Sequence, residues 1–307
     1  MRAAFVLTGH LRDTCESRAG ISVVERHLDA CRAAFDGRCD FFLYTWDRLD
    51  KGPEFPGGAP VQFPGGNNRC SPLCQQTMHQ HNTSAWSCVS NLSATLAPAA
   101  VAVESQDRLQ DDDTPWVNQS LRGFRMNTAA MLGGLDLMTR HAAAMGHTYD
   151  AVVRLRADVG CRKMRGRPEF REQFIDTDGW QRVRKKAAAV HNNSAELAPH
   201  LRSQIELCDR PRKKRIDFCF WSAPPEPLLR TVESLRGDEL DRLARNVSTN
   251  MSSPDWLVHL PVGGLAPASS LPDSARYLDR RHMPLFVENL LFCAARARGV
   301  RWPPCVV

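Results

Sequence analysis

Short uninterrupted runs of apolar residues alternate along the chain with segments in which apolar residues recur at three- and four-residue spacing. The runs at 3–8 and 40–47 are typical of strands buried on both faces of a parallel sheet. Between them, the apolar residues of 20–35 repeat at helical spacing, which predicts a helix with one buried face. Strand, helix and strand in this order predict a right-handed βαβ crossover.

The same alternation returns later in the chain. We expect strands at 99–103, 150–158 and 217–221, and helices at 121–145, 226–235, 238–245 and 284–298. A Gly133-Gly134 pair inside the long helix indicates a close approach or a kink. Residues 162–215 are basic and irregular.

A region rich in Pro and Gly, and then in Asn, Ser and Cys, interrupts the alternation at about 48–96, and we interpret it as an irregular insertion. The remaining elements predict one α/β domain over 1–307, with a mostly parallel sheet flanked by helices. A chain of 307 residues with 43% hydrophobic and 24% charged residues is neither disordered nor collagen-like.

Targeting signals and net charge limit where the protein acts and which classes of ligand it binds. No apolar stretch is long enough to span a membrane and no signal peptide is visible, so a secretory address or membrane anchor would lie outside these residues, or the chain is cytosolic. The net charge of +6 fits an anionic ligand but is too small to indicate a dedicated nucleic-acid binder.

Glycan acceptor motifs and cysteines favour the lumen of the secretory pathway over the cytosol. The chain holds six N-x-[ST] triplets where chance predicts about one. Their asparagines are Asn82, Asn91, Asn118, Asn192, Asn246 and Asn250. Eleven cysteines are many for a cytosolic enzyme and predict several disulfides, although the odd number leaves at least one cysteine unpaired.

Cysteines and histidines crowd the end of the expected insertion. Cys70, Cys74, His79, His81 and Cys88 fall within one short window. Zinc binding is one interpretation, but the spacing matches no well-formed zinc finger or ribbon, so disulfides are favoured. The consecutive carboxylates at 111–113 repel one another and are expected to face water.

Polar residues follow the expected strands at the edge where open parallel sheets bind ligands. The first strand is followed by Gly9 and Arg12, and the central strand carries Arg154, Arg156 and Asp158. Glycine lets the backbone approach a ligand, arginine grips phosphate, and a carboxylate binds a hard divalent cation. Because the chain has no P-loop and no G-x-G-x-x-G after the first strand, P-loop kinases and dinucleotide oxidoreductases are disfavoured. A nucleotide site of another kind is predicted.

Five stretches carry a family resemblance: FVLTGHLR, FLYTWD, YDAVVRLRAD, DFCFWSAP and PLFVENLLFCAARARGV, which run in order from residue 5 to 300. In order and spacing they resemble the landmarks of the GT-A-like glycosyltransferases of the WavE type, which include bacterial lipopolysaccharide-synthesis proteins and algal and viral relatives. The resemblance implies a Rossmann-like nucleotide-sugar domain of the GT-A type.

The resemblance also implies roles for individual residues. Asp158 would contact metal and diphosphate, with Arg154 and Arg156 nearby. The motif here is Arg-Ala-Asp and not Asp-x-Asp, so dependence on Mn²⁺ or Mg²⁺ stays open, and Arg156 would itself neutralise diphosphate charge. Glu288 matches a glutamate at the start of the family's C-terminal helix and would act as a base on the acceptor, or would only begin that helix. Asp217 is a second candidate for acceptor contact.

We therefore expect transfer of a sugar from a nucleotide-sugar donor to a hydroxyl of a glycan or glycoprotein, in the Golgi, with no nucleic-acid partner. One alternative is a catalytically inactive glycan- or nucleotide-binding relative, suggested by the incomplete Asp-x-Asp motif. A second alternative is another luminal group transferase such as a sulfotransferase, against which the missing P-loop argues.

Overall fold

The computed structural model describes residues 1–11, 14–15, 18–49, 84–109, 115–116, 119–157, 177–192, 205–207 and 219–236. In chain order its elements are β1 (Ala3–Thr8), α2 (Arg18–Ala34), β2 (Cys39–Trp46), α4 (Trp86–Leu96), β3 (Ala100–Glu104), η1 (Gln106–Leu109), β4 (Pro115–Trp116), β5 (Gln119–Ser120), α5 (Leu121–Met145), β6 (Ala151–Arg156), α6 (Thr177–Asn192), β7 (Ile205–Leu207), β8 (Cys219–Ser222) and α8 (Glu226–Glu233). None of the helices described is both long and apolar enough to span a bilayer.

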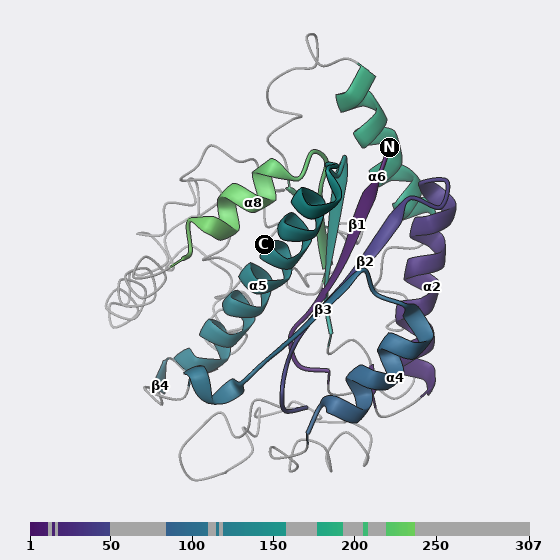
Figure 1. The fold of residues 1–307 in the computed structure, drawn as a ribbon. Coiled ribbons are helices and arrows are strands. Elements are labelled where there is room, and N and C mark those ends of the chain that lie inside the picture. The colour runs from purple at the N-terminus through teal and green to yellow at the C-terminus, as the bar shows by residue number, and fades with distance from the viewer. Residues whose placement is uncertain are drawn as a thin grey trace, which may run out of the picture.

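A six-stranded sheet in the order β3-β2-β1-β6-β8-β7 forms the centre of the fold (Figure 1). Strand β1 pairs in parallel with β2 and β6, and β2 pairs in parallel with β3, whereas β8 is antiparallel to β6 and β7. This confirms a mostly parallel α/β sheet that is compatible with a Rossmann-like fold. The chain moves outward from β1 to β2 and β3 and then returns to β6 on the other side of β1, which creates a topological switch point between β1 and β6.

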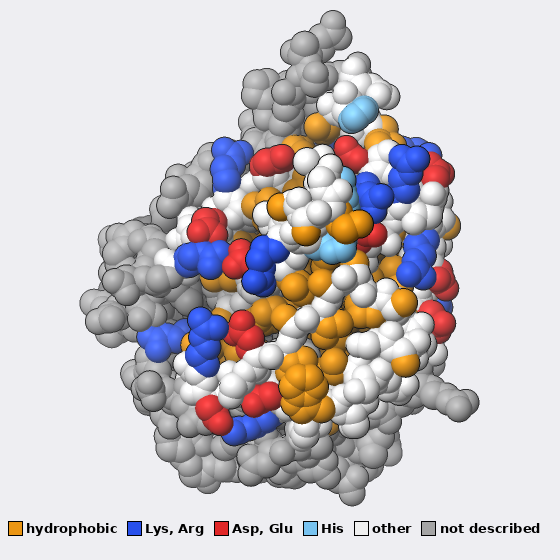
Figure 2. Space-filling view, viewed as in Figure 1, with side chains coloured by type: hydrophobic (Ala, Val, Ile, Leu, Met, Phe, Trp, Pro, Cys, Tyr) orange, Lys and Arg blue, Asp and Glu red, His pale blue; other side chains and the backbone are white. Residues whose placement is uncertain are grey.

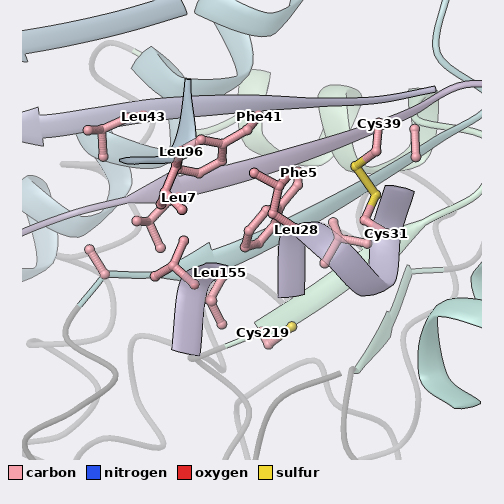
Figure 3. Packing of buried hydrophobic residues seen from close by; sticks show 14 of the residues in the cluster. Phe5, Leu7, Leu28, Cys31, Cys39, Phe41, Leu43, Leu96, Leu155 and Cys219 are labelled. Carbon is pink, nitrogen blue, oxygen red and sulfur yellow. A yellow bond between two sulfur atoms is a disulfide. The ribbon is translucent and has the colours of Figure 1, made fainter. Parts of the chain in front are cut away.

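Helices cover both faces of the sheet, and this explains the apolar runs of its central strands. In Figure 1, α2, α4 and α6 lie on one side of the sheet and α5 and α8 on the other. All six residues of β1 are buried. On the α2 side, the Phe5 ring lies 5.4 Å from that of Phe41 and 5.9 Å from that of Trp180 (ring centroids), in the core drawn in Figure 3.

On the opposite face, α5 lies almost directly on the strands. A Cβ added to Gly133 would come within 2.0 Å of the Tyr44 ring, and one added to Gly134 within 2.6 Å of the Thr8 methyl group. The glycine pair therefore marks a close approach of the helix to β1 and β2, which is one of the two readings that the sequence allowed.

Disulfides lie on the α2 side of the sheet. Cys15 is bonded to Cys88 of α4, and Cys31 of α2 to Cys39 of β2, with Cα atoms 5.4 and 5.9 Å apart. Figure 3 shows the second bond at the margin of the core. Cys219 is also disulfide-bonded. Disulfides persist in oxidising compartments, so these pairs agree with a location outside the reducing cytosol. They also remove Cys88 from the zinc alternative.

Two segments that the sequence indicated to be irregular contain helices. The last part of the expected insertion, within 48–96, forms α4, and part of the basic region at 162–215 forms α6. Each helix buries a stripe at helical spacing: Cys88, Val89, Leu92 and Leu96 in α4, and Trp180, Val183 and Ala187 in α6. Both helices were missed from the sequence because their short apolar stripes lie within segments of mostly polar or basic residues. The rest of the expected insertion, 50–83, and the helices expected at 238–245 and 284–298 lie outside the described residues.

Candidate functional site

The carboxyl ends of the central strands meet at one edge of the sheet. The Ala157 N–H donates to the Thr8 carbonyl oxygen at 2.9 Å, and the Gly9 N–H donates to the Tyr44 carbonyl oxygen at 3.1 Å. The residues that follow β1 and β6 are therefore neighbours at the switch point, as the sequence predicted. Asp158 comes directly after Ala157 but lies outside the described residues, as do Arg12, Asp217 and Glu288.

Gly9 forms the turn at the end of β1. Its φ of +104° belongs to a backbone conformation that residues with a side chain rarely adopt. The Thr45 hydroxyl at the end of β2 donates to the Gly9 carbonyl oxygen at 2.9 Å and fixes the turn. A Cβ on Gly9 would lie at ordinary contact distance, 3.8 Å, from Cγ of Arg156. The glycine is therefore required by the backbone angle rather than by lack of space, and Arg156 lies beside it.

Arg154 lies one layer deeper than Arg156, and its side chain is only 1% exposed. Its Nε donates to the Thr8 hydroxyl at 2.9 Å and its Nη2 to Oδ1 of Asn127 on α5, also at 2.9 Å. Its guanidinium carbon lies 5.2 Å from the centre of the Phe220 ring, a cation–π arrangement. In the described structure Arg154 thus joins β1, α5 and β8, and it positions the strand end that carries Gly9.

A second group of polar side chains braces the end of β2. Nε2 of His10 lies 3.0 Å from Oε1 of Gln106, a hydrogen bond, and the Gln106 N–H donates to Oδ1 of Asp47 at 2.8 Å. Sequence reasoning missed Gln106, because a lone glutamine after a strand carries no signal of its own. Burial, and then a hydrogen bond with Glu104, raises the pKa of the Tyr44 hydroxyl, so this phenol remains protonated.

The structure places two of the candidate glycan acceptors. Asn91 on α4 and Asn192 at the end of α6 both have exposed side chains. Their positions are accessible to a glycosylating enzyme. The other candidates, Asn82, Asn118, Asn246 and Asn250, lie outside the described residues.

A groove of about 460 Å³ lies midway along α5, where that helix meets α8, and not at the strand ends. At its rim, Arg236 bonds Asp136 of α5 at 2.9 Å and Glu233 of α8 at 2.8 Å. The hydrogen bond from Arg236 lowers the pKa of the Glu233 carboxyl group. The groove is part of the packing between two helices on the surface, and it does not include the residues that the sequence singled out.

Comparison of the chain with protein-family models, curated proteins and solved structures finds no match. The chemistry must therefore be inferred from the chain's own residues. A switch-point edge with a positive-φ glycine turn and an arginine on the adjacent strand suits a ligand that carries phosphate. Among the described residues, metal-ligand spacing occurs at the opposite edge of the sheet and not at this one.

Proposed function

We propose that the protein is a glycosyltransferase that moves a sugar from a nucleotide-sugar donor to a hydroxyl of a glycan or glycoprotein. The observation that carries the proposal is the convergence of the Gly9 turn and Arg156 at the switch point between β1 and β6. Open α/β sheets bind their ligands at such points. The resemblance of five ordered sequence stretches to GT-A-like glycosyltransferases of the WavE type supplies the reaction class.

The reaction needs positive charge at the leaving group. The bond between the anomeric carbon and the diphosphate oxygen breaks, its electron pair stays on the diphosphate, and the acceptor hydroxyl oxygen forms the new bond to the anomeric carbon. Arg156 would neutralise the charge that develops on the diphosphate. A carboxylate takes the proton from the acceptor hydroxyl, and Glu288 and Asp217 remain the candidates for this role.

The described residues also suggest how the donor site keeps its shape. The buried Arg154 holds the Thr8 hydroxyl, and the Thr45 hydroxyl holds the Gly9 carbonyl. The turn is therefore fixed before a ligand arrives, which limits the ordering cost of binding.

A divalent cation is not required by this scheme. The Arg-Ala-Asp motif offers Asp158 as a single carboxylate, and one carboxylate is a weak site for Mn²⁺ or Mg²⁺ unless the donor's phosphates complete it. If bound, the cation would be held by Asp158 and would add to the positive charge that Arg156 supplies at the leaving group.

Donor binding is the direct test. Calorimetry with UDP- and GDP-sugars, each with and without Mn²⁺, should detect one donor, and Arg156→Gln should weaken its binding at least about tenfold, as expected for loss of a charged phosphate contact. Arg184→Gln is the matched control, because Arg184 on α6 is paired with Asp36 at 2.9 Å on the other face of the sheet. Asp158→Asn should weaken binding only if the donor binds more tightly with Mn²⁺ present, because without a cation the Asp158 carboxylate would repel the diphosphate.

The outcomes separate the alternatives. Absence of binding for every donor tested would overturn the proposal. Donor binding that depends on Arg156 but gives no transfer to any glycan acceptor would instead indicate an inactive binding relative. Binding of a sulfate donor in place of nucleotide-sugars would favour a sulfotransferase.

We also propose that the protein works in the secretory lumen, in the Golgi, where nucleotide-sugars and glycan acceptors meet. The two intact disulfides and the exposed acceptors Asn91 and Asn192 support this location. Mass spectrometry of protein made in a secretory host should find glycans on Asn91 and Asn192 and oxidised Cys15, Cys31, Cys39 and Cys88. Unmodified asparagines together with free thiols would contradict it.

A further inference from the structure

A second group of chemically reactive side chains lies at the amino edge of the sheet. Asp40 near the start of β2, His141 on α5 and His147 after α5 each offer a ligand atom, and these atoms all lie within 4.8 Å of one another. The strands between this edge and Gly9 are six residues long, which separates the two edges by about 20 Å. Figure 2 shows histidine side chains at the surface of this side of the molecule.

The end of α5 brings the two histidines together. Gly146 adopts a φ of +65°, and the His147 N–H donates to the Ala142 carbonyl oxygen at 3.1 Å. Such a left-handed glycine turns the chain back at a helix C-terminus. The ring of His147 therefore lies 6.0 Å from that of His141 (centroids), although the backbone has already left the helix.

His147 has an unsatisfied ring nitrogen. Its Nε2 is buried and has no hydrogen-bond partner in the described structure. The nearest carboxylate oxygen, Oδ2 of Asp40, is 3.6 Å away, which is too long for a hydrogen bond. It is close to the distance of about 3.3 Å that separates two ligands of a tetrahedral zinc ion with bonds of about 2.0 Å. A buried polar atom without a partner is costly, and a metal ion between these two atoms would give the His147 nitrogen the partner that it lacks.

Neighbouring residues hold the three side chains in place. The Tyr149 hydroxyl and Nη1 of Arg2 both donate to Oδ2 of Asp40 at 2.8 Å. The His141 ring packs against Phe42, with ring centroids 5.4 Å apart. Outer contacts of this kind orient metal ligands. Arg2 also disfavours a cation at this position, because its guanidinium is already paired with the Asp40 carboxylate and would repel a second positive charge.

We propose that Asp40, His141 and His147 bind one divalent transition-metal ion of the zinc type. Two imidazoles and a carboxylate are a ligand set that Zn²⁺ takes in proteins, with the fourth position left for water, and all three residues are partly buried. The ion connects the end of α5 to the start of β2. The site is independent of donor binding, because it lies at the other edge of the sheet.

Metal titration of the full chain tests the proposal. Free thiols are first alkylated, because the odd cysteine count leaves at least one that would bind zinc. The protein is then cleared of metal with EDTA and titrated with Co²⁺, whose visible absorption reports four- or five-coordinate nitrogen and oxygen ligands, followed by Zn²⁺. We expect one equivalent of Co²⁺ to bind and Zn²⁺ to displace it. His141→Gln and His147→Gln should each weaken binding at least about tenfold.

The chain offers a matched control and a gain-of-binding variant. Nδ1 of His191 also lies 3.6 Å from a carboxylate, that of Asp150, but no third ligand in the described residues joins them. His191→Gln should therefore leave binding unchanged. Arg2→Gln should tighten binding several-fold, a result that loss of folding cannot imitate.

Several outcomes would overturn the proposal. Binding of less than one equivalent would do so, and so would binding that survives both His141→Gln and His147→Gln with the variants still folded by circular dichroism. Equal loss of binding in His191→Gln would show that surface histidines, and not this cluster, take the metal.

Discussion

The two faces of the sheet are built from the same strands but are stabilised differently. Alternate residues of β1 point to opposite faces, so Phe5 and Leu7 join the core under α2, α4 and α6 while Thr8 lies under α5. Strand β6 divides in the same way: Val153 belongs to the apolar core, and Arg154 to the polar contacts with Thr8 and α5. The first face is apolar and holds the disulfides of the described residues. The second face also buries apolar residues, but it adds a buried cation and a helix whose glycine pair packs closely against strand side chains.

The two faces therefore differ in how strictly they restrict the side chains that can occupy them. An apolar core under a disulfide-bonded helix layer tolerates exchange of one hydrophobic residue for another. The α5 face accepts fewer alternatives at Arg154 and at the glycine pair, because the guanidinium needs its hydrogen-bond partners and the glycines leave no room for a side chain. Strand β6 directs Arg154 and Arg156 to the α5 face. The proposed donor site is therefore positioned by the face that tolerates fewer substitutions.

The largest effect is expected from the disulfides of the apolar face. Cys15–Cys88 closes a loop with a sequence separation of 73 and Cys31–Cys39 one of 8. In the chain-entropy description, losing the first bond costs about 4 kcal/mol of unfolding free energy and losing the second about 2.5 kcal/mol. Urea unfolding of C15A/C88A and C31A/C39A under non-reducing conditions measures both. Equal losses, or the reverse order, would contradict the loop-length account.

The next effect contrasts one substitution of similar volume on each face. Arg154→Met leaves the Thr8 hydroxyl and the Asn127 carbonyl without their donor, and buried acceptors left unsatisfied cost about 1–3 kcal/mol each. Because removal of a buried charge recovers part of this, we expect a net loss of about 3 kcal/mol. Leu43→Met, in the apolar core, should cost less than about 1.5 kcal/mol.

Chemical denaturation of both variants decides whether the faces differ as described. If R154M and L43M lose the same free energy of unfolding, the α5 face does not restrict its side chains more than the apolar face does. Donor binding gives a second readout: R154M should weaken it by misplacing the Gly9 turn, and L43M should leave it unchanged.

The sequence predicted five of the six strands of the sheet, because the central strands are buried on both faces and therefore read as continuous apolar runs. It missed β7, a three-residue strand within the segment that was interpreted as basic and irregular. The position of Gly9 beside β6 also followed, since both strand ends were assigned to one edge. The antiparallel direction of β8 did not follow, because direction leaves no mark in the residue pattern of a short strand.

The cluster at the amino edge could not be predicted from the sequence, because its residues come together only in the folded chain. His141 and His147 are near each other in the chain, but Asp40 is distant and joins them only because β2 starts where α5 ends. Gln106 likewise reaches His10 through the fold and not through any local motif. Helices α4 and α6 were missed for a different reason: short apolar stripes within polar or basic composition give weak periodicity.

The smallest effect concerns the contact between α5 and β1. Alanine at a helix interior is favoured over glycine by about 1 kcal/mol, so Gly134→Ala would stabilise an uncrowded helix. Here the new methyl group would lie 2.6 Å from Cγ2 of Thr8 and 3.0 Å from Cγ1 of Val6, and overpacking of this kind costs about 1–3 kcal/mol. We expect a net destabilisation of about 1 kcal/mol in chemical denaturation. The direction of the change is the decisive observation.

A double-mutant cycle locates that cost. Thr8→Ser removes the crowded methyl group but keeps the hydroxyl that accepts from Arg154. Gly134→Ala combined with Thr8→Ser should therefore be more stable than the sum of the single changes predicts, because the closest clash exists only when both methyl groups are present, although the contact with Val6 remains. Strict additivity, or a stabilising Gly134→Ala on its own, would mean that α5 lies farther from β1 than described. Close steric packing would then no longer distinguish the α5 face from the apolar face.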